Sequence, residues 1–548
     1  MGVVGLAAEA HERKQHDGHK GLDYRRRKGL QKTLARKRAP AHPKPEYLAL
    51  PDGVHYVRGP VGAALYDLRD RKVWSVPALF ARALERCAQG ALLETALAEL
   101  AGGPPAPDTL AFVRSFARRH PALALVPTVP AKPTPPPVTR TFGLKFLILE
   151  LTDACNLRCR HCFLPARFGE TPGETLPLAR WIELLHEAHA IGYRSLLVTG
   201  GEPMLLGGLA RLLLAAHRAG FARIELLTNA TRLTDGLLTA LAEARAAVFV
   251  SIYSNDPAVH DAVTGAPGSF DRTIAAVRRL LARGIETNVN LVIMDRNAAS
   301  HGDTIAFLRD LGVAPDRIRS SRASLRGRCA EHLPDARPPR SLRGLDGWAT
   351  DGARLIKNGC WTGNAAIIAN GDVLVCVGER APVGNVARAP LRSVIESPAL
   401  RALWNITLDD VPGCAPCEFR FACADCRAEA HTYAGDLLAR DPTCPYDPAT
   451  GQWHCDPIAP DDRPTRREGL HTAELDGHLL VADLEAAQMH VLNPLAAAIW
   501  DLCNGRRTPA AIAGLLADHF RIPLEAPLSD TQRALGELRT RALIETNL

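Results

Sequence analysis

The pattern of apolar and polar positions divides the chain into regions of different character. From residue 142 onwards, short apolar runs alternate with longer stretches in which apolar residues recur at helical spacing. The apolar runs cover residues 145–151, 195–199, 224–228, 247–251 and 287–294, and the amphipathic stretches include residues 180–190, 205–219 and 272–283. Repeated strand–helix alternation predicts an α/β fold with a parallel sheet under covering helices. About five or six such units suit a partial TIM-like barrel, a (β/α)6 arrangement, whose ligands lie at the carboxyl ends of the strands.

The regions around this predicted barrel follow other patterns. Residues 46–127 alternate apolar stretches with helix formers and predict a small α/β or winged-helix domain. Proline is too dense in residues 128–141 for a helix or a sheet interior, which predicts a stiff linker before the barrel domain of residues 142–345. Towards the end of that domain, the Arg/Pro-rich residues 320–350 are expected to form a connecting loop.

The remainder of the chain divides into a cysteine-rich domain and a second compact domain. Residues 346–456 hold most of the cysteines and little regular pattern, and residues 457–470 form another linker. Residues 471–548 predict a strand pair followed by helices, the first of which begins at Asn493-Pro494. Shifting this domain back by 416 residues aligns it with residues 67–87 at five identical positions, a faint similarity to the N-terminal domain.

The formal net charge of +7 is confined to one end of the chain. Residues 1–45 hold twelve basic and four acidic side chains, which predicts a disordered basic tail and leaves residues 46–548 at −1. A near-neutral folded part disfavours a nucleic-acid partner. We see no secretory signal and no apolar run of the roughly 18 residues that a membrane span needs, so we expect a cytoplasmic protein without a membrane partner.

In the cytoplasm thiols stay reduced, so clustered cysteines are expected to bind metal rather than to form disulfides. Ten of the fourteen cysteines fall into two groups. The first group follows the first predicted strand and consists of Cys155, Cys159 and Cys162. Three thiolates hold three irons of a cubane cluster and leave the fourth iron open to a cofactor or substrate. A structural zinc site, the alternative, usually closes with four ligands.

This group resembles the cysteine motif of the radical S-adenosylmethionine (radical SAM) superfamily, where it holds a 4Fe–4S cluster that binds SAM. Residues 199–203, after the second predicted strand, look like the GGEP motif that binds the amino group of SAM. The resemblance further implies contacts to the ribose, carboxylate or adenine of SAM at three later strand ends and one loop position. The implied cofactor-binding residues are Gly200, Gly201, Glu202, Pro203, Asn229, Ser251, Met294 and His161. The last four are also compatible with ordinary strand-end, core or loop positions.

Seven further cysteines are similar in spacing to the SPASM domain of radical SAM enzymes that act on peptides, apart from a shorter last gap. They are Cys360, Cys376, Cys414, Cys417, Cys423, Cys426 and Cys444. The resemblance assigns two auxiliary clusters, one to Cys414, Cys417, Cys423 and Cys444, the other to Cys360, Cys376 and Cys426. The fourth ligand of the latter stays open between Cys329, Cys455, another side chain and an open iron. A zinc ribbon is the alternative for the whole group.

Three other positions complete the chemical inventory. Val377 stands where the sulfatase-maturing branch of the family has an acidic residue that serves as a base, so no catalytic residue is assigned. Cys87 and Cys503 lie in helical patterns and are expected to be buried small apolar side chains.

Residues 471–548 resemble PqqD-like domains, which bind the leaders of ribosomally made, modified peptides. A strand edge beside a helix offers a groove in which an extended leader adds as a strand. A DNA-binding or purely packing winged helix is the alternative. Through the faint similarity described above, residues 46–127 are a candidate second module of this kind.

Together these motifs predict a radical SAM peptide maturase. An electron from a donor such as flavodoxin or ferredoxin would cleave SAM, and the 5′-deoxyadenosyl radical would take a hydrogen from a bound precursor peptide. The terminal domain would raise the local concentration of that peptide by holding its leader. The alternative is a related enzyme that matures a tetrapyrrole or another small cofactor. A non-enzymatic iron–sulfur regulator is a third hypothesis, which the GGEP-like residues disfavour because a regulator needs no SAM site.

Overall fold

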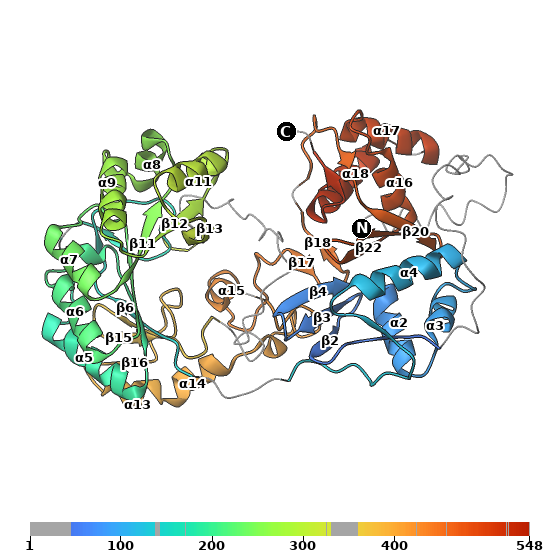
Figure 1. Cartoon of the computed structure of the whole chain (residues 1–548). Coiled ribbons are helices and arrows are strands. Elements are labelled where there is room, and N and C mark those ends of the chain that lie inside the picture. The colour runs from blue at the N-terminus through green and yellow to red at the C-terminus, as the bar shows by residue number, and fades with distance from the viewer. Residues whose placement is uncertain are drawn as a thin grey trace.

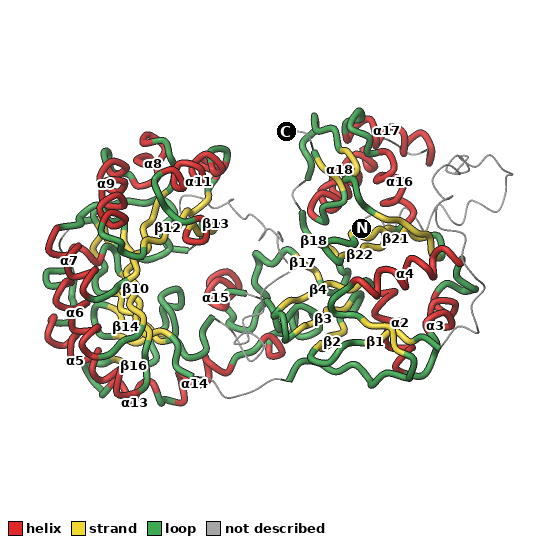
Figure 2. Tube along the Cα trace, in the orientation of Figure 1, coloured by secondary structure: helices red, strands yellow, loops and turns green. Residues whose placement is uncertain are grey.

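The computed structural model describes residues 45–137, 143–324, 326–329, 360–455 and 457–546, apart from positions 170, 172, 424, 522 and 524. A helix-covered sheet lies on the left of Figure 1, and two smaller domains lie on the right, with the cysteine-rich region between them. Figure 2 shows that loops dominate this middle region. The predicted basic tail up to residue 44 and most of the predicted loop at 320–350 lie outside the described residues.

Six parallel strands form the barrel sheet in the order in which they occur in the chain. They are β6 (Phe146–Glu150), β9 (Ser195–Thr199), β10 (Arg223–Thr228), β11 (Ala247–Ile252), β12 (Thr287–Ile293) and β13 (Ile318–Arg322). The predicted partial barrel is therefore confirmed. Its sixth strand, β13, occupies residues where the sequence predicts the start of a loop. Ile318 is the one apolar residue of this strand, so the strand carries no alternating pattern that would reveal it.

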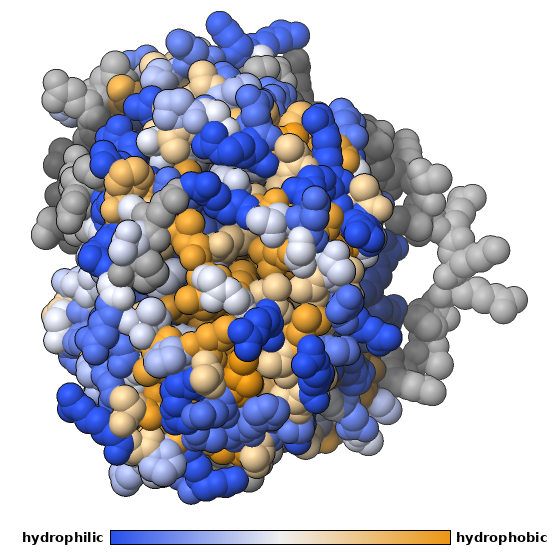
Figure 3. All heavy atoms as spheres, turned by 90° about the vertical axis from the view of Figure 1, so that its left-hand side faces the viewer, coloured by the Kyte–Doolittle hydropathy of each residue, from blue (hydrophilic) through white to orange (hydrophobic). Residues whose placement is uncertain are grey.

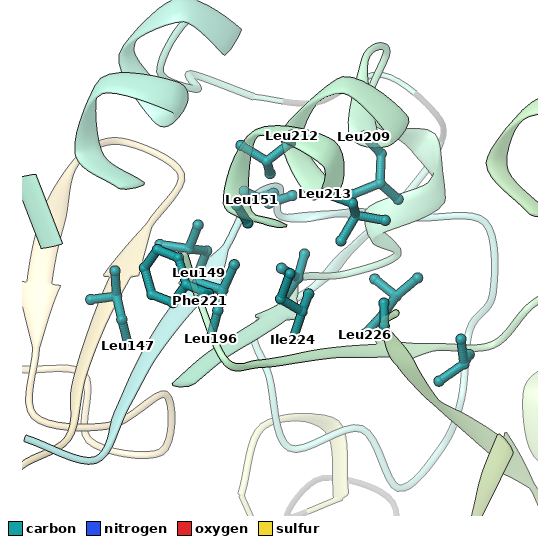
Figure 4. Close-up of a cluster of buried hydrophobic side chains, with 14 of the residues drawn as sticks. Leu147, Leu149, Leu151, Leu196, Leu209, Leu212, Leu213, Phe221, Ile224 and Leu226 are labelled. Atoms are coloured by element: carbon teal, nitrogen blue, oxygen red, sulfur yellow. The ribbon is translucent and has the colours of Figure 1, made fainter. Parts of the chain in front are cut away.

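Helices from the connecting segments cover the outer face of this sheet (Figure 1). They are α5 (Leu178–Ile191), α6 (Leu209–Ala219), α7 (Asp235–Glu243), α8 (Pro257–Thr264), α9 (Ser269–Ala282) and α11 (His301–Asp310). In α6, residues Leu209, Leu212 and Leu213 share one face because their spacing matches the helical repeat. Figure 4 shows them above Leu149 of β6 and Leu196 of β9, in one buried cluster. Full burial of each such leucine contributes about 1.5–3 kcal/mol.

The cysteine-rich region extends the barrel sheet on its open side. Strand β14 (Ala365–Ile368) pairs in parallel with β6, and β15 (Asp372–Leu374) and β16 (Gly384–Asn385) follow it in antiparallel order. The helices of this region are α13 (Leu391–Ile395), α14 (Pro398–Asn405) and α15 (Arg427–Ala434), and a short hairpin joins β17 (Tyr446–Asp447) to β18 (Gln452–Trp453). Because β14 pairs with a strand more than 200 residues earlier, local sequence pattern does not indicate this continuous sheet.

Two small domains each combine a three-stranded antiparallel sheet with three helices. The N-terminal domain consists of β1 (Tyr47–Ala49), β2 (Val54–Arg58), β3 (Ala63–Asp67), β4 (Lys72–Val76), α2 (Ala78–Ala88), α3 (Leu93–Leu100), α4 (Pro107–Arg119) and β5 (Ala124–Val126). The C-terminal domain consists of β19 (Thr465–Arg466), β20 (His471–Leu475), β21 (His478–Asp483), β22 (Gln488–Leu492), α16 (Pro494–Leu502), α17 (Pro509–Phe520), α18 (Glu525–Thr540) and β23 (Ile544–Glu545). Strand β19 lies inside the predicted linker 457–470 and pairs with β23, so the C-terminal fold includes part of that linker.

The outer surface of the helical layer is mixed in character. Figure 3 shows this side of the molecule, on which hydrophilic side chains surround smaller groups of apolar ones. Among the described residues, no helix combines the length and the apolar composition that a membrane span requires.

Replacing Leu213 by alanine tests the contribution of the leucine core. We expect a loss of about 2–5 kcal/mol in the free energy of unfolding, because Leu213 is completely buried and its removal leaves a cavity. Chemical denaturation followed by circular dichroism measures this loss. Leu214, the adjacent and only partly buried residue, provides the control: Leu214→Ala should cost clearly less. Equal losses for the two variants would contradict the packing described here.

Candidate functional site

The residues that the sequence predicts to bind the cluster and SAM lie at the carboxyl ends of the parallel strands. The three-cysteine loop follows β6 and residues 200–203 follow β9, while Asn229, Ser251 and Met294 stand at the ends of β10, β11 and β12. Cys155, Cys159 and Met294 also share one buried apolar cluster, although Met294 lies far along the chain. All of these positions therefore lie at one edge of the sheet, where a barrel of this type binds its ligands.

The cysteine loop is held against the barrel by backbone hydrogen bonds. Strand β7 (Ala154–Cys155) pairs in parallel with β8 (Arg167–Phe168) and closes the loop on itself. The backbone N–H groups of Arg158 and Arg160 donate to the carbonyls of Thr264 and Val263 at the end of α8, at 2.8 and 3.2 Å. These bonds fix a segment that has almost no regular secondary structure of its own.

The thiols of this loop lie in an apolar environment. Cys155 and Cys159 are buried, and Cys162 is half-buried. Burial raises the pKa of Cys155 to about 11 and that of Cys159 to about 12. The thiols of Cys155 and Cys159 are therefore protonated at neutral pH. Binding of iron, which requires thiolates, would release these protons and stabilise the folded loop at the same time.

The two glycines of the GGEP-like segment pack directly against the cysteine loop. A Cβ atom on Gly200 would come within 2.8 Å of the carbonyl oxygen of Thr152, and one on Gly201 within 2.2 Å of that of Ala154. The N–H of Gly201 donates to the same Thr152 oxygen at 2.7 Å. Any side chain at these positions would push the two loops apart. In this chain the glycines thus serve the close packing of two backbone segments, a role that the sequence alone did not indicate.

Glu202 is a buried brace between the ends of β9 and β10. Its carboxylate accepts hydrogen bonds from the Thr228 hydroxyl at 2.6 Å and from the N–H groups of Asn229 and Met204 at 2.8 and 3.0 Å. Burial raises the pKa of Glu202, and the three donors counteract that rise. Pro203 begins a short 3-10 helix after it. The Glu202 carboxylate thus spends most of its hydrogen-bond acceptor sites on three donors of the chain itself, whereas the sequence analysis expected it to accept from the ammonium group of SAM.

Asn229 is tied to the cysteine loop by a polar network. Its side-chain amide donates to the Asn156 side-chain oxygen at 3.0 Å, and its own side-chain oxygen accepts from the Thr231 hydroxyl at 2.7 Å. Asn156 in turn donates to the Thr231 hydroxyl at 2.8 Å. Asn156 directly follows Cys155, so this network joins the cysteine loop to the end of β10. Sequence reasoning missed Asn156 because a single asparagine next to a cysteine carries no distinctive signal.

His161 and Tyr253 form an aromatic pair beside the cysteines. Their ring centroids are 4.6 Å apart at an interplanar angle of 59°. Burial lowers the pKa of His161 to about 4, so its ring is neutral at physiological pH. The Tyr253 hydroxyl makes side-chain hydrogen bonds with Cys159 and with Ser251. Tyr253 is therefore a site residue that sequence reasoning missed, and its place two residues after Ser251 was the available signal.

Met294 lines a cavity at the end of β12. The cavity has a volume of about 370 Å³ and is bordered by Arg160, Val263, Met294, Asp295 and Arg296. Met294 is itself buried, and its backbone N–H donates to the Asn297 side chain at 2.7 Å. An apolar side chain beside two arginines suits a ligand with a flat ring and anionic groups.

The remaining cysteines fall into two spatial groups. The pKa of Cys360 is raised by burial of its thiol and then by the nearby charges of Cys376 and Cys426. The pKa of Cys417 is raised to about 12 by burial, and Cys444 and Cys414 add to that rise. Cys426 thus lies with Cys376 and Cys360, although only two residues separate it from Cys423 in the chain.

Two cysteines that the sequence left open lie elsewhere. Cys329 is buried, and its pKa is raised to about 11 by burial and then by the charge of Cys162, which places it beside the first cysteine loop. The Cys455 sulfur donates to the carbonyl of Trp453 at 3.5 Å. Cys87 and Cys503 are completely or almost completely buried in the two small domains, as predicted for small apolar side chains.

Acidic side chains link the cysteine-rich region to the barrel. Glu379 is buried and lies 2.7 Å from the Nδ1 atom of His431, while Arg380 donates to Glu150, at the end of β6, at 2.7 Å. The Ser324 hydroxyl, just beyond β13, donates to Glu429 at 2.6 Å. These contacts cover the carboxyl ends of the strands with the cysteine-rich region. The side chain of Val377 has no carboxylate. The next carboxylate along that loop belongs to Glu379.

Three family models match the chain in sequence. The radical SAM superfamily matches residues 149–308, the iron–sulfur cluster-binding SPASM domain matches residues 360–427, and PqqD, the coenzyme PQQ synthesis protein D, matches residues 479–544. These matches coincide with the barrel, the cysteine-rich region and the C-terminal domain.

Individual relatives carry different functions. The chain is 25% identical over 341 residues to the AdoMet-dependent heme synthase of Nitratidesulfovibrio vulgaris, which covers 56% of this chain and 93% of the relative. It is 28% identical over 330 residues to the PqqA peptide cyclase of Streptomyces rochei, which covers 55% of this chain and 89% of the relative. The crystal structure of Streptococcus suis SuiB bound to the precursor peptide SuiA is 16% identical, covers 72% of this chain and 99% of that chain, and has a TM-score of 0.44.

The barrel, its three-cysteine loop and the matching family model define a radical SAM enzyme. More closely, the chain carries radical SAM, SPASM and PqqD-like domains in the order expected of a radical SAM/SPASM peptide maturase. The resemblances drawn from the cysteine spacing and from residues 471–548 are thereby confirmed at the level of domains.

The radical SAM and SPASM domains imply 4Fe–4S clusters together with SAM. The donor sets fit this chemistry, because each group consists of thiols, the ligands that iron–sulfur clusters normally use. Among the described residues, no three Cys, His, Asp or Glu side chains converge as ligands of one metal ion do. A cubane cluster does not require such convergence on one point, because each of its cysteine ligands binds a different iron atom.

Removing the three thiols of the first loop tests its role. In a Cys155→Ala/Cys159→Ala/Cys162→Ala variant we expect no formation of 5′-deoxyadenosine from SAM and dithionite, and a loss of about four irons per chain. The iron bound by the SPASM cysteines should remain. Anaerobic reconstitution, iron analysis and chromatography of the products measure both effects. Cys87→Ala is the control and should keep full iron content and SAM cleavage; cleavage by the triple variant would refute the assignment.

The neutral state of His161 generates a second test. Because its pKa of about 4 keeps the ring uncharged, we expect SAM cleavage by His161→Phe to stay within about threefold of the unmodified enzyme, with the same pH profile between about pH 6 and 8. His161→Asp should lose cleavage, since it buries an unpaired charge. A His161→Phe variant without activity would show that a ring nitrogen is required.

Proposed function

We propose that the enzyme modifies a ribosomally synthesised precursor peptide whose leader is held by residues 471–548. The observation that carries this proposal is the PqqD-like domain, matched at residues 479–544, on the same chain as a radical SAM and a SPASM domain. A relative named PqqA peptide cyclase, 28% identical over 330 residues, supports a peptide substrate. Tethering by the leader would raise the local concentration of the core peptide at the barrel mouth.

The chemistry assigns distinct tasks to the residues of the chain. When bound, SAM on its reduced cluster supplies a 5′-deoxyadenosyl radical that takes a hydrogen atom from the substrate. Cys155, Cys159 and Cys162 would hold that cluster and leave one iron without a protein ligand. Glu202 and Asn229 would keep the cysteine loop in place, since both anchor it or its neighbouring turn to the strand ends. The covering SPASM region would keep water away from the reacting groups.

The leader would add to an edge of the C-terminal sheet. In that sheet β20 and β22 are the edge strands, and β21 lies between them. The backbone carbonyl of Glu474 in β20 accepts a hydrogen bond from the Thr109 hydroxyl of the N-terminal domain. We therefore assign the leader to β22, where backbone hydrogen bonds give affinity and side chains beside α16 give specificity.

The auxiliary sites would move electrons. Cys360, Cys376 and Cys426 would hold one cluster, and Cys414, Cys417, Cys423 and Cys444 the other. The first of these would stand next to the barrel, since Arg380, four residues after Cys376, donates to Glu150 at the end of β6. An external donor such as flavodoxin or ferredoxin would deliver the electron that begins each cycle. The dependence on such a donor and on reduced thiols supports a cytoplasmic location.

A second candidate is a tetrapyrrole substrate. It is favoured by the relative named AdoMet-dependent heme synthase, which matches 93% of its own length but only 56% of this chain. More than two-fifths of this chain therefore lies outside that match. The PqqD-like domain distinguishes the two candidates, because a peptide leader gives it a ligand and a tetrapyrrole does not.

Co-expression with a short peptide encoded beside the gene tests the proposed function. We expect a mass change in the core part of that peptide, which identifies the bond that forms or breaks. The peptide should bind the enzyme through its leader, and removing the leader should lower modification by about a hundredfold at micromolar peptide, because tethering no longer raises the local concentration. Mass spectrometry and fluorescence anisotropy measure the two effects.

The opposite result is equally specific. A tight porphyrin absorbance spectrum with no peptide binding and no peptide modification would replace the peptide by a tetrapyrrole substrate. SAM cleavage itself should be present in both cases, because it depends on the first cysteine loop and not on the class of substrate.

A further inference from the structure

The N-terminal and C-terminal domains have the same architecture. Each has a short first strand, a three-stranded antiparallel sheet, three helices and a last strand, in that order along the chain. In the N-terminal domain the last strand, β5, pairs back with the first, β1, and in the C-terminal domain β23 pairs back with β19 in the same antiparallel manner. The order of all eight elements and the closing pair of strands therefore agree between the two domains.

From the third strand of the sheet to the second helix, the two domains also keep a constant spacing along the chain. Strand β4 begins at Lys72 and its counterpart β22 at Gln488, a difference of 416 residues. The same difference separates the first residues of α2 and α16 and those of α3 and α17. Cys87 and Cys503, which this shift superposes, are both buried in the corresponding helix or at its end. The N-terminal domain is thus a second copy of the PqqD-like fold, too divergent for its sequence to show more than a few identities.

The two copies are stacked, with the sheet of the second on the helices of the first. In β21, Leu479 and Val481 belong to the core of the C-terminal domain, whereas Leu480 and Ala482 belong to the core of the N-terminal domain. Alternate residues of one strand thus serve two hydrophobic cores, as the period of two requires. The Thr109 hydroxyl of α4 donates to the Glu474 carbonyl at the edge of β20, at 2.7 Å. Without the N-terminal copy, this sheet would expose an apolar face to water.

The N-terminal copy in turn rests on the SPASM region. Ala64, Tyr66 and Val73, on the face of its sheet away from its own helices, form a cluster with Phe419 and Tyr446. The Tyr66 hydroxyl donates to the backbone carbonyl of Glu418 at 2.6 Å. Glu418 directly follows Cys417, one of the cysteines of the second auxiliary group.

The turn between β2 and β3 strengthens this contact. A Cβ atom on Gly59 would come within 2.2 Å of the Glu418 carboxylate, so a side chain at this position would displace that carboxylate. The Tyr446 hydroxyl donates to the other oxygen of the Glu418 carboxylate at 2.6 Å. The N-terminal copy is therefore fitted to the cysteine loop of the second auxiliary group rather than merely lying beside it.

One edge of the sheet of the N-terminal copy is hydrogen-bonded to another segment of the same chain. The N–H of Tyr56, in the edge strand β2, donates to the carbonyl of Thr134 in the proline-rich linker at 2.9 Å. The other edge strand, β4, contacts β22 of the C-terminal copy. The β2 edge, at which a leader peptide could add, is thus occupied by a segment of the same chain.

From these contacts we infer that the N-terminal copy is an internal docking module whose partner is the C-terminal copy. It holds the recognition domain in a fixed position over the second auxiliary group. This inference rests on the proposed function for the assignment of the C-terminal copy as the recognition domain. Its physical consequence is that a bound leader would start from a defined place relative to the barrel mouth, which sets the effective concentration of the core peptide.

A charge placed in the stacked face separates docking from recognition. In Leu480→Glu, the new carboxylate points into the N-terminal core and leaves the core of the C-terminal domain intact. Leu515→Glu is the matched control, because the same change falls on an exposed position of the same domain. Thr109→Val is a milder variant that removes the hydrogen bond to Glu474 without a change of side-chain size. All are studied as full chains with reconstituted clusters.

We expect amide hydrogen exchange in α4, β20 and β21 to accelerate by roughly tenfold or more in Leu480→Glu, less in Thr109→Val and not at all in Leu515→Glu. Binding of a synthetic peptide encoded beside the gene should change by less than about threefold in Leu480→Glu, whereas its modification should fall by roughly tenfold or more. SAM cleavage without peptide should be unchanged.

Two results would overturn the inference. Unchanged exchange in a folded Leu480→Glu variant would show that the two copies do not dock, and faster exchange with full modification would show that docking does not position the leader. If no peptide binds any variant, the proposed function fails, while the exchange measurement still decides whether the two copies dock.

Discussion

The site depends on the close contact between the backbone of Gly200 and Gly201 and that of the first cysteine loop. The loop has almost no regular structure, so its three thiols acquire defined positions only from the segments packed against it. The N–H groups of Gly201 and Glu202 donate to the carbonyls of Thr152 and Ala154, and the absence of a side chain on either glycine allows this approach. Buried backbone groups must be paired, so this contact also satisfies donors and acceptors that water cannot reach.

Around that contact, buried polar groups connect the strand ends to one another. Glu202 joins the turn after β9 to the end of β10, and the Asn156 amide joins the cysteine loop to Asn229. Such groups are costly to bury unless each finds partners, and here they do. The same low-polarity environment raises the pKa of Cys155 and Cys159, so these two thiols are neutral before a cluster binds, and cluster binding would supply part of the order of the loop. Folding and cofactor binding are therefore linked in this region.

The barrel, the auxiliary groups and the terminal domain were predictable to different degrees. Five of the six barrel strands carry apolar runs, and β13 does not, because four of its five residues are arginine or serine. The spacing of the cysteines reveals their role in the sequence. No such pattern marks Tyr253, Asn156 and Glu379, because a single Tyr, Asn or Glu in a loop is common in any protein. The function of the GGEP-like glycines in loop packing was also hidden, because a glycine suits a ligand and a neighbouring backbone equally well.

The sequence by itself determined the class of chemistry. The spacing of Cys155, Cys159 and Cys162 and the alternation of strands and helices are local properties, which depend on residues close together in the chain. Only the tertiary structure decided that Asn156 meets Asn229, that β14 continues the barrel sheet, and that the two small domains stack on each other. These relations join residues tens to hundreds of positions apart, and packing of complementary apolar faces, rather than local pattern, selects them.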